Sequence, residues 1–199
     1  MENVNNEILK ASVKNDRVEV TFKENFSDEN YSNEVSKKCS QIVHSDLKAA
    51  LEKLKPHLVL ICEQPEARAI IDTGFFDFDI ENLDNYNVTG YSIGGSDEHL
   101  GVTIIGQKLL KSGQVLNLIA PFTKFENNEN YLHAGELLAD IQGCDYEVKE
   151  YLFNQKWGIK QQEFDFDVPD DMELTITDNS TGKSIKKGRK KKEAEVEAA

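Results

Sequence analysis

Apolar and polar residues alternate near the start of the chain, over residues 17–23, in the period-two pattern of a half-buried strand. Ile8–Val13 precedes this run, and Lys14–Asp16 between the two has turn-forming residues. The pattern therefore predicts a β-hairpin. The polar stretch Asn25–Ser36 predicts a loop, and a short strand is expected over Lys38–Val43.

A helical pattern follows, in which apolar residues recur every three or four positions from Leu47 to Cys62. Ser45 is expected to cap this helix at its N-terminus. Pro56 lies inside the pattern, so the helix is expected to kink there or to restart with Pro56 in its first turn. Residues 65–87 have no clear period and predict either a strand or a loop held by aromatic side chains.

The second half of the chain is first rich in strand patterns and then helical. Three strands are expected over Val88–Ile93, Gly101–Leu109 and Gln114–Phe122. A helix over Tyr131–Gln142 is expected to end at Gly143, and a second short helix is expected from Asp145 to Leu152, with Trp157 closing the core. Strands followed by separate helices predict an α+β fold: an antiparallel sheet of about five strands packed against two or three helices.

The composition suits one domain with an extension. The chain has 199 residues and a net charge of −13, of which −10 falls on residues 1–160. This negative net charge argues against nucleic-acid binding through a broad basic face. It is compatible with binding to basic proteins. We expect a compact α+β domain over residues 1–160 and a charged, largely disordered tail over residues 161–199.

Three widely spaced cysteines (Cys39, Cys62 and Cys144) form no disulfide framework and no zinc motif, which favours a reducing compartment. The polar N-terminus lacks the features of a signal peptide, and no apolar run is long enough to span a bilayer. The expectation is a cytoplasmic protein with no membrane partner, in the host cytoplasm if a phage encodes it. No metal site and no cofactor are predicted.

Charge in the tail is sorted into blocks. Residues 161–180 hold seven acids and no base, and residues 181–192 hold seven bases and no acid. A marginal hairpin over residues 173–187 is an open alternative to disorder. The basic run predicts salt-dependent binding to nucleic-acid phosphates, while a solubilising tail is the alternative. Its members are Lys183, Lys186, Lys187, Arg189, Lys190, Lys191 and Lys192.

Aromatic and acidic residues alternate just before the basic run, at Phe164, Asp165, Phe166 and Asp167. Such a segment resembles the acidic tails with which single-strand-binding proteins dock on a partner, so it predicts a protein-binding segment. The alternative is an edge strand in which Phe164 and Phe166 pack on the body.

The loop Gly94–Gly101 brings together a serine, two acids and a histidine (Ser96, Asp97, Glu98 and His99). Hydrolysis or metal binding here is one hypothesis. A polar hairpin loop is the other, since catalytic groups usually come from separate elements. The remaining histidines (His44, His57 and His133) show no metal-ligand spacing and are predicted to be structural or solvated.

Several short motifs resemble those of a group of uncharacterised bacteriophage and prophage proteins. They are Val43–Lys48, Lys55–Glu63, Val88–Gly90, Gly106–Gln107 and Pro121–Thr123. The resemblance covers roughly residues 8–153. It implies a setting among phage replication and recombination functions, and it assigns no catalytic residue.

Taken together, these observations favour a non-enzymatic phage-type accessory protein that acts by binding, through its basic tail, in DNA replication or recombination. Two alternatives stay open. One is a protein-interaction or inhibitory module that uses the acidic body, and the other is a hydrolase or metal-dependent enzyme built on the 94–101 loop.

Overall fold

A computed structural model describes residues 4–26, 31–126 and 131–158. Within these residues the chain forms seven strands: β1 Val4–Lys14, β2 Arg17–Phe26, β3 Tyr31–Ile42, β4 Tyr86–Gly94, β5 Gly101–Leu109, β6 Val115–Ile119 and β7 Thr123–Lys124. The helices are α1 Ser45–Glu52, α2 Lys55–Ile61, α3 Ala67–Thr73 and α4 Ala134–Phe153, with short 3-10 turns η1 Ile80–Leu83 and η2 Asp97–His99. The acidic segment, the basic run and the proposed hairpin of the tail lie outside the described residues.

The strands form one antiparallel sheet in the order β3-β2-β1-β4-β5-β6, with β7 paired to β5 beyond the end of β6. It consists of two three-stranded meanders, β1–β3 and β4–β6, that meet where β1 pairs with β4. This arrangement confirms the predicted α+β class with an antiparallel sheet. The sheet has seven strands where about five were expected, and β7 is a short strand that the sequence did not predict.

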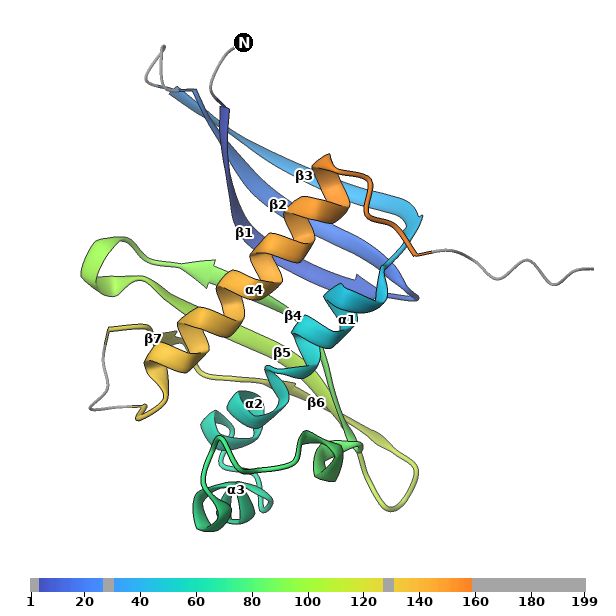
Figure 1. The fold of residues 1–199 in the computed structure, drawn as a ribbon, viewed down its shortest axis with the longest axis vertical. Coiled ribbons are helices and arrows are strands. Elements are labelled where there is room, and N and C mark those ends of the chain that lie inside the picture. Colours follow the sequence, from blue (N-terminus) through green and yellow to red (C-terminus); the bar gives the residue numbers. More distant parts are fainter. Residues whose placement is uncertain (1–3, 27–30, 127–130, 159–199) are drawn as a thin grey trace, which may run out of the picture. The chain divides into compact units, whose positions relative to one another are not determined.

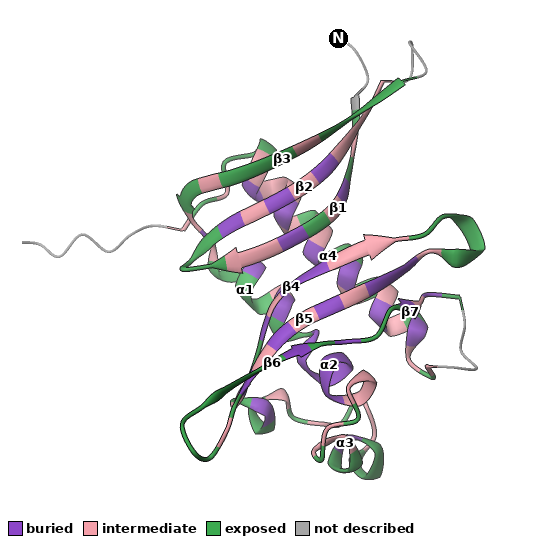
Figure 2. Ribbon diagram, turned by 180° about the vertical axis from the view of Figure 1, so that it is seen from behind, coloured by how far each residue is buried: buried purple, intermediate pink, exposed green. Residues whose placement is uncertain are grey.

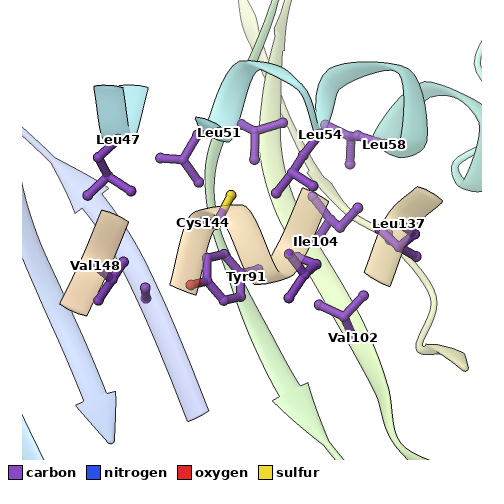
Figure 3. Packing of buried hydrophobic residues seen from close by; sticks show 14 of the residues in the cluster. Leu47, Leu51, Leu54, Leu58, Tyr91, Val102, Ile104, Leu137, Cys144 and Val148 are labelled. Carbon is purple, nitrogen blue, oxygen red and sulfur yellow. The ribbon is translucent and has the colours of Figure 1, made fainter. Parts of the chain in front are cut away.

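Helices α1, α2 and α4 cover one face of the sheet, as Figure 1 shows, with α4 crossing both meanders. Seen from behind in Figure 2, the strands lie in front of the helices. The core fills the space between the layers, where Leu47 and Leu51 of α1 meet Tyr91 of β4 and Cys144 and Val148 of α4 (Figure 3). We call the other side of the sheet, which no helix of the described residues covers, the uncovered face.

The period-two pattern of the first hairpin is confirmed, because Val18, Val20 and Phe22 are buried on the helix-covered face. The prediction of a loop over residues 25–36 is wrong at both ends, since β2 continues to Phe26 and β3 begins at Tyr31. That strand lies at the edge of the sheet and carries few apolar residues, with only Val35 and Cys39 packed against the core. Its sequence therefore lacks the alternation that would have revealed it.

The restart of the first helix at Pro56 is confirmed, because α2 begins with this proline in its first turn. The N-cap of α1 is His44 rather than Ser45, since the His44 Nδ1 accepts a hydrogen bond from the backbone N–H of Asp46 at 3.2 Å. Of residues 65–87, the part before Tyr86 forms α3, η1 and the connecting loops, and strand β4 begins only at Tyr86.

The last helix is one continuous element of 20 residues, not two helices separated at Gly143. A Cβ at Gly143 would meet nothing within 4 Å, so this position faces open space in the middle of α4. Trp157 is 38% exposed and does not close the core; its ring N–H donates to the carbonyl oxygen of Tyr151 at 3.0 Å. No helix in the described parts of the chain is long and apolar enough to cross a bilayer.

Candidate functional site

The uncovered face of β1–β3 carries the polar half of the alternating pattern. The register places Lys10 opposite Thr21, and Thr21 opposite Ser36, across the three strands. In the next row, Ser12 lies opposite Glu19, and Glu19 lies opposite Lys38. Since neighbouring residues in a row share a face of the sheet, lysine and hydroxyl side chains gather there.

These side chains line a shallow hollow of about 290 Å³. We call it the basic hollow and define it by Lys10, Ser12, Lys14, Glu19, Thr21, Ser36 and Lys38. Lys37 also borders this hollow, but its ammonium group lies 5.0 Å from the centre of the Phe22 ring and belongs to the covered side. The basic hollow thus holds three ammonium groups and one carboxylate.

Glu19 lies between two of the lysines and pairs with both. Its carboxylate oxygens are 3.6 Å from the Lys14 Nζ and 3.5 Å from the Lys38 Nζ. The side chains of Lys14 and Lys38 are 68% and 84% exposed, so these are surface ion pairs that stabilise the fold by about 1 kcal/mol or less each. These ion pairs therefore contribute little to the stability of the fold. The ammonium groups of both lysines remain accessible to an anion from solvent.

Three hydroxyl groups lie among the lysines of the basic hollow. The Thr21 and Ser36 hydroxyls share a hydrogen bond of 2.9 Å, and the Ser12 hydroxyl donates to the backbone oxygen of Glu19 at 3.5 Å. Ammonium donors on a solvent-exposed surface suit phosphate oxygens. Because a hydroxyl has a single proton, the three hydroxyls add one free donor, from the Thr21–Ser36 pair. By strand rise and strand spacing, the Cα atoms of Lys10 and Lys14 are about 13 Å apart, and the Cα of Lys38, in the row of Ser12, is about 12 Å from each. The ammonium groups of Lys14 and Lys38 lie closer together, because both pair with the Glu19 carboxylate. Lysines spread over three strands in this way suit neighbouring phosphates of a polyanion.

The tail residues that the sequence singled out, both the basic run and Phe164–Asp167, lie outside the described residues. The basic hollow was not predicted from the sequence. Lys10, Ser12 and Lys14 do alternate along one strand, which is a detectable signal. Lys38 joins them only through the pairing of β2 with β3, and the sequence predicted a loop over much of β3.

The loop between β4 and β5 leaves its polar side chains exposed. Gly95 has a φ of 81°, and residues 97–99 form η2. The His99 Nδ1 accepts a hydrogen bond from the Lys124 Nζ at 2.9 Å. Among the described residues, no hydrogen bond joins the side chains of Ser96, Asp97 and Glu98, so these groups do not form a relay here.

His57 is the centre of a buried polar cluster and is fully inaccessible to solvent. Its Nε2 lies 3.1 Å from an Asp140 carboxylate oxygen, and its Nδ1 lies 2.6 Å from the Tyr131 hydroxyl. Because the carboxylate accepts, Nε2 carries the proton, and Nδ1 accepts from the Tyr131 hydroxyl. Burial lowers the pKa of His57, although the Asp140 carboxylate acts in the opposite direction.

This histidine cluster has the composition of a catalytic relay but not its accessibility. Both ring nitrogens of His57 are occupied by protein partners, and Phe75 packs 4.8 Å from the ring. Burial also raises the pKa of the Tyr131 hydroxyl, which keeps that group protonated near neutral pH. The geometry therefore supports a structural role for His57, as predicted.

Over the parts of the chain that the structure describes, no group of three or more histidine, cysteine, aspartate or glutamate side chains is arranged to hold a metal ion. Comparison with protein-family models, with curated proteins and with solved structures gave no match.

Proposed function

We propose that this protein is a non-enzymatic accessory protein that binds nucleic acid, with the basic hollow as the phosphate-binding surface of its folded part. The observation that carries the proposal is the clustering of Lys10, Lys14 and Lys38 with three hydroxyl groups on the uncovered face.

The distribution of charge supports this proposal. Strands β1–β3 hold six bases and four acids, a balance of +2, whereas residues 1–160 as a whole carry −10. A local basic surface on an acidic molecule attracts a polyanion at that surface and repels it elsewhere. This contrast in charge favours binding of the nucleic acid across the uncovered face rather than elsewhere on the protein.

The chemistry of the basic hollow also indicates how binding works. The defining residues of the hollow include no aromatic side chain, so they offer no platform on which bases stack. Contacts to phosphates alone give affinity that is independent of sequence and strongly dependent on salt. The basic run, Lys183–Lys192, would add further phosphate contacts, and Phe164–Asp167 would bind a protein partner. A setting in phage DNA replication or recombination is part of the proposal and rests on the sequence resemblance.

The test is fluorescence anisotropy with labelled single-stranded DNA, duplex DNA and RNA over a range of salt concentrations. The full-length chain is compared with Lys10→Ser/Lys14→Ser, which leaves Lys38 and Glu19 to neutralise each other. Losing two phosphate contacts should reduce the slope of log K against log salt by about 1.4 to 1.8 and lower affinity at low salt at least roughly tenfold.

The matched control is Lys53→Ser/Lys111→Ser, which removes the same charge from exposed positions elsewhere. Affinity in the control should stay within about threefold of the wild type. Equal losses in both variants would show that only net charge matters and would contradict a site at the basic hollow. A chain ending at Ser180 measures the share of the tail, and no binding by the full-length chain would favour a protein partner instead.

A further inference from the structure

The two edges of the sheet differ in chemistry. The edge strand β3 has twelve residues and carries Glu34, Lys37 and Lys38, and such charges are a common protection against edge-to-edge pairing. The opposite edge strand, β6, has five residues with the sequence Val-Leu-Asn-Leu-Ile and no charge. Within the described residues no strand lies on its outer side (Figure 2). The edge formed by β6 is therefore open to pairing.

The hydrogen-bond ladder shows which backbone groups of β6 face outward. The backbone N–H of Ala120 donates to Ile104 at 2.9 Å, and that of Leu110 donates to Gln114 at 2.8 Å. In an antiparallel pair such bonded positions alternate, so Leu116 and Leu118 direct their backbone groups toward β5. The N–H and C=O groups of Val115, Asn117 and Ile119 consequently point away from the sheet.

The sequence of β6 reads almost the same in both directions about Asn117. We propose that β6 pairs with β6 of a second copy of this chain, antiparallel and centred on Asn117. Val115 then lies opposite Ile119 of the second copy, and Leu116 lies opposite Leu118. A two-fold interface requires a surface that complements itself, and the alternation of equivalent apolar residues about Asn117 satisfies this requirement. Three outward-facing residues per copy supply six N–H···O hydrogen bonds between the two strands.

The side chains of β6 also leave apolar surface for a second copy to cover. Val115 is 56% exposed, Leu116 is 42% exposed and Ile119 is 69% exposed, and Leu109, the β5 partner of Val115, is 53% exposed. At about 200 Å² for a large side chain, these fractions amount to at most roughly 440 Å² per copy, or ~900 Å² for the pair. This area is below the roughly 1,200 Å² of standard specific interfaces, so we expect a weak dimer that depends on protein concentration.

The two faces of β6 are distinct in this pairing. A Cβ at Gly106, the partner of Leu118 in β5, would lie 2.5 Å from the Leu58 side chain of α2, so Leu118 belongs to the helix-covered face. The Gln107 side-chain amide donates to the Asn117 side-chain oxygen at 3.0 Å on the uncovered face. An edge-to-edge two-fold axis runs perpendicular to the sheet, so both uncovered faces lie on the same side of one continuous sheet.

A disulfide at the two-fold axis tests the register. In full-length Asn117→Cys, the two introduced thiols should lie in a bonded antiparallel pair with Cα atoms about 5.5 Å apart, within the range for a disulfide. Mild oxidation should then give a covalent dimer. The matched control Val115→Cys places each thiol about 13 Å from its symmetry mate, too far for a bond. Equal cross-linking in the wild type, which retains Cys39, Cys62 and Cys144, would overturn the assignment.

Sedimentation velocity from about 1 to 300 μM chain tests the pairing without a cross-link. The wild type should shift from monomer toward dimer across this range. In Val115→Lys/Ile119→Lys, like charges oppose each other across the interface, and the chain should stay monomeric. In Val115→Lys/Ile119→Glu, each lysine opposes a glutamate of the second copy, and dimerisation should return. A wild type that stays monomeric at the highest concentration, or two double variants that behave alike, would overturn the proposal.

Discussion

Asp145 provides the most direct test of the energetics of the core. It lies on α4, and one of its carboxylate oxygens accepts a hydrogen bond of 2.6 Å from the hydroxyl of Tyr91, a fully buried residue of β4. Burial raises the pKa of Asp145 from 3.8 to about 6, although the Tyr91 hydrogen bond and the charge of Lys149 act to lower it. The folded protein therefore holds this proton more tightly than the unfolded chain does.

The size and sign of the effect on stability follow from that pKa. A rise of about two units corresponds to roughly 3 kcal/mol of folding free energy. Below about pH 3 Asp145 is protonated in both states and costs nothing. As the pH rises, the unfolded chain loses the proton first, so the free energy of unfolding falls between about pH 3 and pH 6 and stays lowered above that.

The variant Asp145→Asn cannot ionise, yet its side-chain oxygen still accepts the hydrogen bond from Tyr91. We expect it to be more stable than the wild type by about 2 to 3 kcal/mol near pH 8 and by only about 0.5 kcal/mol near pH 4. Urea unfolding at several pH values measures this difference. Asp84→Asn, at an exposed position, is the control and should show no such trend. A difference that does not grow with pH, or a variant less stable near pH 8, would refute the reasoning.

Two further predictions concern the histidine cluster and the glycines. Because burial lowers the pKa of His57, the unfolded chain binds the proton first, and the free energy of unfolding falls as the pH falls below about 6.5. His57→Gln should lower the stability near pH 8, and it should reduce the loss of stability between about pH 6.5 and lower pH in the same urea-unfolding series. A Cβ at Gly90 would lie 2.8 Å from the Ser12 Cα in β1, so Gly90→Ala should destabilise the protein by more than about 2 kcal/mol. Gly143→Ala, in the open middle of α4, should stabilise it by about 0.5 to 1 kcal/mol, and thermal melts showing the reverse order would contradict both assignments.

The elements that were predictable have strong local signals. Alternation over residues 17–23 revealed the first hairpin, and Pro56 marked the start of α2, because both patterns arise within a few residues of sequence. The continuity of α4 was missed because Gly143 is a local stop signal. Burial of Ile141 and Cys144 on either side of it favours one helix through tertiary packing, which outweighs the weak propensity of a single glycine.

The candidate site was less predictable than the fold, for a reason of geometry. Lys10 and Lys38 are far apart in the sequence and lie on one surface only because β1, β2 and β3 pair in a particular register. The register of a strand is set by which of its residues are buried. Because β3 carries few apolar residues, its sequence does not show how it pairs with β2. The self-complementary order of β6 was present in the sequence, but it has meaning only once β6 is known to lie at an edge.

The short pairing of β1 with β4, which joins the two meanders, bears on how cooperatively the protein unfolds. β1 and β4 share three residue pairs, whereas β1 and β2 share ten and β4 and β5 share eight. Helix α4 is hydrogen-bonded to both meanders. The Tyr151 hydroxyl donates to the backbone oxygen of Gln41 in β3, and the Asp145 carboxylate accepts from the Tyr91 hydroxyl in β4. Helix α4 therefore links the two meanders in addition to the three-pair ladder of β1 and β4, so cooperativity between the halves depends on this helix as well as on the strand ladder.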